Sequence, residues 1–208
     1  MDVSLIESIE KKLTGQKPGM EAQALMSPVD TRMYAKPDYS TSIACVMLLL
    51  FPSQGQWNVI YIKRSDNNPN DRHAGQVSFP GGKMEEIDES YEACALRETY
   101  EEIGIPQDKI GIIGTLSSLY VHVSNFMVYP YVGFVTSDLD LQLQASEVKD
   151  VIIMPLDELR DKEIIKKGPV QLYNGSTLDV PYYDLAGNKL WGATAMITSE
   201  FLNIIADL

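Results

Sequence analysis

The chain has 208 residues, of which 45% are hydrophobic and 22% charged, values typical of a soluble globular protein. This length suffices for one sizeable core and is short for two. The formal net charge of −12 argues against nonspecific nucleic-acid binding, which depends on Lys and Arg neutralising phosphates. The two cysteines, Cys45 and Cys94, form no paired motif, so we expect both to be reduced, as in a cytoplasmic protein.

The N-terminal segment predicts a short amphipathic helix, because Ile6, Ile9 and Leu13 recur at helical spacing. It begins with an acid and has no long apolar run, so we do not expect a signal peptide. Residues 15–37 are rich in Gly, Pro and Met without a clear period, which predicts an irregular lead-in. The longest apolar run, residues 43–51, is far shorter than the roughly 20 residues of a membrane span. We therefore expect a buried strand there and no membrane association.

A hairpin is the next predicted unit. Residues 42–51 and 57–64 have the composition of strands, and the polar segment 53–56 between them is typical of a turn. A polar loop follows, and residues 76–79 predict a short strand. The sequence then reaches Pro80-Gly81-Gly82, which we interpret as a glycine turn.

The remaining elements follow from periodicity and turn residues. They are strands at 110–119, 126–135, 139–143 and 151–154, a short helix at 155–159, hairpin strands at 178–183 and 189–191, and a closing helix at 193–208. No repeat or composition change divides the chain. We therefore expect one domain over residues 1–208, in which residues 1–40 form the first helix and the lead-in.

An acidic helix is the most informative element. It is predicted between an N-cap at Asp88 and a left-handed C-terminal residue at Gly104. Glu98 and Glu102 lie one turn apart, with Glu101 beside them. The opposite, core-facing side is predicted to carry Ala93, Leu96, Tyr100 and Ile103. Clustered acids repel one another, so a divalent cation with oxygen ligands would stabilise them.

An isolated Glu-x-x-Glu-Glu is usually a solvated helix face, but here Arg97 precedes the acids, glycines lie upstream and Gly104 follows. This combination resembles the Nudix box, the signature of hydrolases that cut a diphosphate linked to a second moiety. The resemblance implies an α/β/α sandwich with a mixed β-sheet and a requirement for Mg²⁺ or Mn²⁺. The interval from Gly82 to Glu89 is one residue longer than the Nudix pattern, so either Asp88 or Glu89 is the first acid of the box.

The resemblance also implies residue roles. Glu98 and Glu102 would be the principal metal ligands, assisted by Glu101 and the carbonyl of Gly81. Arg97 would hold the glutamates in place by charge-assisted hydrogen bonds rather than touch substrate. Glu147, which lies outside the box, is a candidate for a further acid that acts as base or ligand. The alternative for Glu147 is an ordinary solvated side chain.

A second motif resembles that of the coenzyme A pyrophosphatase branch of Nudix enzymes. It comprises Arg64-Ser65, then Arg72-His73-Ala74-Gly75 and finally Phe79-Pro80-Gly81-Gly82, with Trp191-Gly-Ala-Thr-Ala195 matching further on. The resemblance implies that Arg64, Arg72, His73 and Gly75 bind substrate. Asp71 stands where the motif has its second Arg, and Arg72 lies one position later. An arginine here would suit the 3′-phosphate of coenzyme A.

The expected reaction is cleavage of coenzyme A or an acyl derivative to 3′,5′-ADP and (acyl-)4′-phosphopantetheine. One alternative is hydrolysis of another nucleoside diphosphate derivative, such as ADP-ribose, a dinucleotide or a nucleoside triphosphate. The other is a Nudix-fold ligand sensor without turnover, against which the intact set of box glutamates argues. A homodimer is left open.

Overall fold

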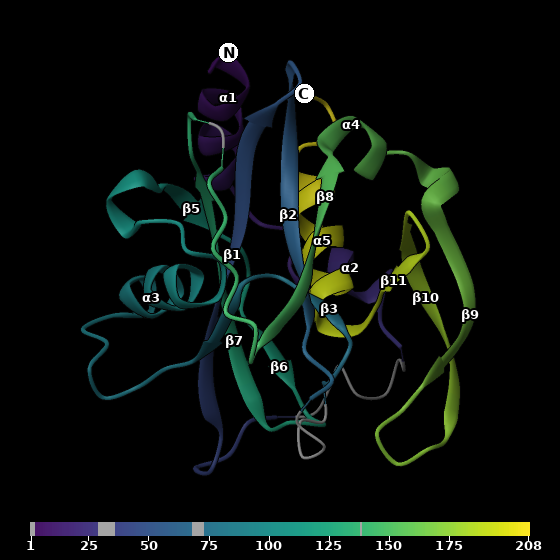
Figure 1. Cartoon of the computed structure of the whole chain (residues 1–208). Helices are drawn as coiled ribbons and strands as arrows, with labels where there is room; N and C mark the ends of the chain where they lie inside the picture. Colours follow the sequence, from purple (N-terminus) through teal and green to yellow (C-terminus); the bar gives the residue numbers. More distant parts are fainter. Residues whose placement is uncertain (1–2, 29–35, 68–72, 138) are drawn as a thin grey trace.

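The computed structural model describes residues 3–28, 36–67, 73–137 and 139–208. A mixed β-sheet lies between two helical layers (Figure 1). Helix α3 (Tyr91–Ile103) covers one face and packs on a cluster that contains Cys45 and Cys94, both of which are free and buried. Helices α1 (Ser4–Leu13) and α5 (Gly192–Ile204) cover the other face. The α/β/α sandwich that the sequence predicts is therefore confirmed.

The predicted hairpin forms the centre of the large sheet. Strand β1 (Ser42–Ser53) pairs antiparallel with β2 (Gln56–Arg64) and parallel with β7 (Phe126–Phe134). The chain reverses at Gln54 and Gly55, both with positive φ, which is the turn geometry that fits the twist of a hairpin. The other strands of this sheet are β3 (Val77–Ser78), β4 (Gly81–Lys83), β5 (Gly111–Thr115), β6 (Leu119–Val121) and β8 (Val148–Pro155).

A second, three-stranded sheet follows the first. It consists of β9 (Ile165–Gln171), β10 (Thr177–Leu185) and β11 (Asn188–Leu190). The hairpin β10–β11 is confirmed, with Leu185 opposite Asn188. Strand β9 was not expected, because most of its side chains are exposed on both faces and leave no alternating apolar pattern. Figure 1 shows this sheet on the side of the molecule where β3 and β8 lie, and β11 contacts β3.

The helices outside the acidic segment agree with the sequence in part. Helix α1 buries Ile6, Ile9 and Leu13, as predicted. Helix α2 (Met20–Ala24) lies in the segment expected to be irregular, so that expectation was wrong; α2 packs on α5 and is too short to show a period. The shorter helices are α4 (Leu156–Leu159), η2 (Gln107–Lys109) and η3 (Lys162–Ile164). Within the described residues, no helix has the length and apolar character needed to cross a membrane.

Helix α3 differs from its prediction in its cap and in its buried side. Ser90, not Asp88, is the N-cap and accepts a hydrogen bond from the Ala93 backbone N–H. Tyr100, expected in the core, is 51% exposed, whereas Glu102 is only 1% exposed. Glu102 can be buried because partners from the sheet surround its carboxylate, and a 3.6-residue period does not reveal such partners.

Two further expectations were wrong. Leu139, Leu141 and Leu143 alternate with polar residues but form no strand. The backbone of this segment instead bonds the end of α3, where the Gln142 and Gln144 N–H groups donate to carbonyls that the last helical turn leaves unpaired. The predicted strand at 110–119 is interrupted after β5 and resumes as β6.

Candidate active site

The glycines before α3 are part of the sheet rather than a free turn. Gly81 and Gly82 lie in β4, opposite Val46 and Cys45 of β1. Gly81 has a φ of 145°, and a Cβ at this position would clash with the Cys45 carbonyl and lie 2.6 Å from Cα of Val46. A Cβ on Gly82 would clash with the Glu98 carboxylate. These two positions therefore exclude larger residues, which allows α3 to approach the sheet with its acids.

Asp88 and Arg97 form a two-point ion pair. Nε of Arg97 donates to Oδ1 of Asp88 at 2.7 Å, and Nη2 donates to Oδ2 at 2.8 Å. The Arg97 hydrogen bond holds the pKa of Asp88 at about 2, below its usual value of 3.8. Glu89 is exposed. The structure therefore places Asp88 rather than Glu89 in the position of the first acid.

Arg97 also holds two of the box glutamates. Its Nη1 donates to Glu98 at 3.0 Å and to Glu101 at 2.8 Å. Its Nη2 further donates to the Lys83 carbonyl at 3.3 Å. An arginine has five N–H donors, and these contacts with Asp88, Glu98, Glu101 and Lys83 use all of them. The structure thus places Arg97 in contact with the acids, and its role in positioning them stays a prediction.

Glu102 is held separately from its neighbours. Its Oε2 accepts a 2.8 Å hydrogen bond from the Gly81 N–H, and its Oε1 lies 3.8 Å from the Arg64 guanidinium. Burial is the main cause that raises the pKa of Glu102 to about 8. The backbone contact from Gly81 to the acids is thus through its N–H. The role of its carbonyl as a ligand stays a prediction.

Glu147 lies close enough to act on this cluster electrostatically. Burial raises the pKa of Glu98, and the charge of Glu147 raises the pKa of both Glu98 and Glu102 further. Glu147 itself is exposed, and its carbonyl accepts from the Ser65 N–H at 2.7 Å, which ties its loop to the end of β2. The structure thus brings together carboxylates from α3 and from a loop more than 40 residues away in sequence.

The predicted substrate-binding residues divide into two places. Arg64 faces the acid cluster at Glu102. His73 contacts Gln76, with Nδ1 3.1 Å from the amide Oε1. Gly75, whose φ is 71°, lines a cavity described below. Arg72 lies outside the described residues.

Comparison with known proteins identifies the class to which this fold and site belong. The sequence pattern of the NUDIX domain family matches residues 41–173. This range contains β1 to β8, α3 and all of the acids described above. The chain therefore belongs to the Nudix family.

Relatives of known sequence carry the same family name. The chain is 44% identical over 87 residues to an uncharacterised Nudix hydrolase, NudL, of Cronobacter sakazakii. This match covers 42% of the chain and 45% of the relative. It is 36% identical over 130 residues to NudL of Citrobacter koseri, covering 62% of this chain and 66% of the relative. These matches thus span less than two thirds of the relatives' length.

Solved structures confirm the fold. The Nudix hydrolase RenU of M. smegmatis aligns with a TM-score of 0.51 at 15% identity, covering 80% of this chain and 88% of that one. A MutT/nudix family protein from Enterococcus faecalis aligns with a TM-score of 0.50 at 17% identity, covering 100% and 76%. At these identities the likeness concerns the fold alone.

Nudix hydrolases generally use divalent metal ions, so the fit of such an ion to these residues matters. In the described part of the chain, no group of three or more His, Cys, Asp or Glu side chains is placed to hold a metal by itself. Mg²⁺ does not need such a cage, because it is usually held by one or two carboxylates, water and substrate phosphates. The oxygen donors of Glu98 and Glu102, which burial disfavours as anions, fit an ion of this kind.

Proposed function

We propose that this protein is a metal-dependent hydrolase that cleaves the diphosphate of coenzyme A or an acyl derivative. The observation that carries the proposal is the arrangement of Asp88, Arg97 and the three box glutamates within a Nudix domain. The products would be 3′,5′-ADP and (acyl-)4′-phosphopantetheine. The ion would be Mg²⁺ or Mn²⁺, held by Glu98 and Glu102, with Glu101 and the Gly81 carbonyl in supporting positions.

The diphosphate is difficult to hydrolyse because its negative oxygens repel a nucleophile. A bound divalent cation neutralises such oxygens and lowers the pKa of bound water. The residues of the chain hold the carboxylates in position for such a cation. Arg97 fixes the carboxylates of Glu98 and Glu101, and the Gly81 N–H fixes Glu102. Pre-arranged carboxylates do not have to reorganise when charge develops in the transition state.

Two more residues take part in the proposed chemistry. Glu147 is exposed and lies within electrostatic range of Glu98 and Glu102. We therefore propose that Glu147 is the general base, which accepts a proton from the attacking water. Arg64 lies beside the acids with its side chain 27% accessible, so its guanidinium can bind a phosphate of the bound diphosphate. His73 and Gly75 would border the substrate from the segment before β3.

Coenzyme A is favoured over other nucleoside diphosphates by the second sequence motif, which leads from Arg64 to Gly82. ADP-ribose, a dinucleotide or a nucleoside triphosphate is the alternative substrate class. A sensor without turnover is the alternative outside the enzymes. Arg97 donates to three carboxylates, those of Asp88, Glu98 and Glu101, and this fixed arrangement favours catalysis over sensing.

A panel of substrates tests the proposal. Coenzyme A, acetyl-coenzyme A, ADP-ribose, a diadenosine polyphosphate and a nucleoside triphosphate are each incubated with Mg²⁺, Mn²⁺ or EDTA. We expect the highest kcat/KM for coenzyme A or its acetyl derivative and no turnover with EDTA. Faster turnover of ADP-ribose would favour the alternative substrate class. Binding without turnover of any compound would favour a sensor.

We further propose that residues 1–208 act as one Nudix domain in the cytoplasm. One hydrophobic cluster joins residues of α1, the large sheet and α5, which supports a single folding unit. Both cysteines are free and buried, as expected for a reducing compartment.

A further inference from the structure

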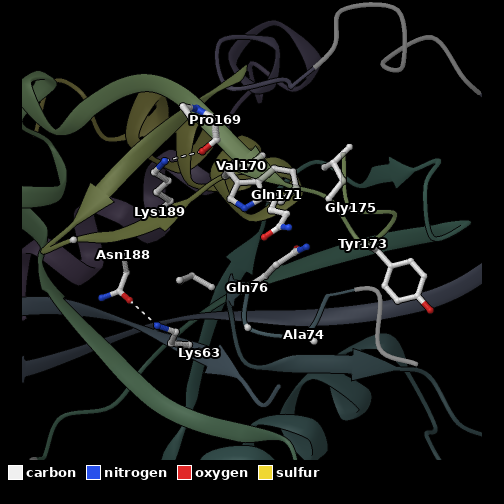
Figure 2. Close-up of a pocket in the computed structure, with 15 residues that line it drawn as sticks. Lys63, Ala74, Gln76, Pro169, Val170, Gln171, Tyr173, Gly175, Asn188 and Lys189 are labelled. Carbon is white, nitrogen blue, oxygen red and sulfur yellow. Dashed lines mark hydrogen bonds between the residues drawn. The ribbon is translucent and has the colours of Figure 1, made fainter. Parts of the chain in front are cut away.

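A cavity of about 600 Å³ lies between the second sheet and the segment that leads into β3 (Figure 2). One wall comes from β2 and residues 74–77, and the other from β9, β11 and the turns beside them. The volume falls in the range of roughly 300–1,000 Å³ that is typical of small-molecule sites. The cavity is therefore large enough for a nucleotide-sized ligand.

The cavity lies on the opposite face of β2 from the acid cluster. Arg64 lies 3.8 Å from Glu102, whereas the neighbouring Lys63 lines the cavity. The segment with Gln76 separates the two places. Its backbone carbonyl accepts from the Arg64 N–H at 2.9 Å, and the same residue forms part of the cavity wall. The cavity and the acid cluster are thus neighbours at the end of β2.

The described residues that line the cavity include two lysines, Lys63 and Lys189, and no Asp or Glu. This is unusual in a chain of net charge −12. Of the acids near these lysines, Asp66 and Asp184 bind other lysines outside the cavity. Those partners are Lys149, 2.6 Å from Asp66, and Lys166, 2.5 Å from Asp184. A third acid, Asp150, lies opposite Lys63 in β8 and accepts a hydrogen bond from the Val151 N–H. The charged side chains among the described lining residues are therefore both cationic.

The two ammonium groups are held in position by neutral groups. Lys63 Nζ donates to Oδ1 of Asn188 at 3.2 Å, and Lys189 Nζ donates to the Pro169 carbonyl at 2.7 Å. Lys189 Nζ also lies 4.9 Å from the centre of the Tyr182 ring. An ammonium has three donors, so these contacts orient each lysine and leave donors for a ligand. Figure 2 shows Lys63, Asn188 and Lys189 gathered at one end of the cavity.

The rest of the lining suits the uncharged part of such a ligand. Gln76 and Gln171 provide amide groups, and Trp191 and Tyr173 provide aromatic rings. Figure 2 shows Tyr173 at the end away from the two lysines. Asn188, Lys189 and Trp191 lie beyond the matched Nudix region, which ends at residue 173. The charged end of the cavity is thus built in part by a segment outside the matched Nudix region.

We propose that this cavity binds a phosphate monoester on a nucleotide-sized molecule, through the ammonium groups of Lys63 and Lys189. The phosphate has two sources: a phosphate of the substrate distant from the bond that is cut, or a separate small phosphorylated ligand. The first source rests on the proposed function. The binding of the phosphate does not, because the lysines lie outside the acid cluster.

Equilibrium binding of adenosine 3′,5′-bisphosphate in EDTA tests the inference without turnover. Isothermal titration calorimetry compares wild type with the double variant Lys63→Gln/Lys189→Gln. We expect the double variant to bind about tenfold more weakly or worse, because two charge-assisted contacts are lost. Adenosine, which has no phosphate, should bind both proteins equally. An equal affinity of wild type and double variant for the bisphosphate, or no binding to wild type at millimolar concentration, would overturn the inference.

Two control variants protect this test. Lys63→Arg/Lys189→Arg keeps both charges, so its affinity for the bisphosphate should stay within a few fold of wild type. If this variant also loses affinity, the cause is a disturbed fold rather than a lost charge. That result would count against the lysines. Lys11→Gln removes the charge of an exposed side chain on α1 and should leave the affinity for the bisphosphate unchanged. Competitive inhibition of coenzyme A turnover by the bisphosphate that weakens in the double variant would identify the substrate as the source of the phosphate. Noncompetitive inhibition, or lysine-dependent binding by a protein that hydrolyses nothing, would support a separate ligand.

Discussion

Asp88 and Arg97 are joined by two parallel hydrogen bonds of 2.7 and 2.8 Å, although nine positions separate them in sequence. The same guanidinium holds Glu98 and Glu101, so one arginine connects the loop before α3 with the acids on it. Asp88 also accepts a hydrogen bond from the Glu85 N–H at 2.8 Å, so the loop before α3 holds its carboxylate as well. This network fixes the carboxylates of Asp88, Glu98 and Glu101 relative to one another.

The first prediction concerns Arg97. Replacing it with alanine should lower kcat by about 10- to 100-fold with little change in KM, because Arg97 orients the acids without facing substrate. Steady-state kinetics with coenzyme A measures both constants. Arg97→Lys should give an intermediate loss, since one ammonium cannot replace five fixed donors. An unchanged kcat with a large increase in KM would place Arg97 in the substrate site instead.

The second prediction concerns the pH dependence of stability. The pKa of Asp88 is about 2 in the folded protein, below its ordinary 3.8, so the stabilisation is complete above pH 4 and is lost as the pH falls towards 2. Asp88→Asn should therefore reduce the free energy of unfolding by about 1–3 kcal/mol at pH 6. The difference from wild type should shrink at pH 3, as measured by urea unfolding. Glu89→Gln is the matched control, and an equal effect of the two variants would contradict the assignment of Asp88.

The third prediction concerns Glu102. Glu102→Gln keeps the shape of the side chain but removes its charge, so we expect turnover to fall by about 100-fold or more with the fold intact. Circular dichroism verifies the fold, and initial rates at saturating Mg²⁺ or Mn²⁺ measure the loss. Glu92→Gln removes an exposed charge from the first turn of the same helix and should leave the rate unchanged. Near-wild-type turnover of Glu102→Gln would show that the acid face is not the metal site.

The fourth prediction separates Arg64 from the lysines of the cavity. Arg64 lies against Glu102, so we expect it to contact the diphosphate, which coenzyme A and dephospho-coenzyme A share. Arg64→Ala should lower kcat/KM for both compounds by a similar factor, roughly 10- to 150-fold. A loss confined to coenzyme A would instead assign the 3′-phosphate to Arg64, the role that the sequence motif suggests for an arginine here.

Much of the framework could be predicted from local patterns. The run from Ile43 to Phe51 is too apolar for any place but the core, and Ile6, Ile9 and Leu13 mark the buried side of α1. The acids of α3 were identified by their spacing, and Arg97 contacts Glu98 and Glu101. The roles of Glu98, Glu101, Glu102 and Glu147 stay predictions.

The errors have physical causes that lie outside local sequence. Glu102 is buried and Tyr100 exposed because the Gly81 N–H and Arg64 provide partners for a carboxylate. Leu139 to Leu143 mimic a strand, yet their backbone bonds the end of α3. The cavity could not be predicted at all, because Lys63 and Lys189 come together only when the second sheet stands beside β2.

The most direct test of the central claim is mass-spectrometric identification of the products that the wild-type protein forms from coenzyme A. We predict equal amounts of 3′,5′-ADP and 4′-phosphopantetheine with Mg²⁺ or Mn²⁺ present, and neither product with EDTA. Intact coenzyme A under every metal condition, or fragments cut at a bond other than the diphosphate, would contradict the account.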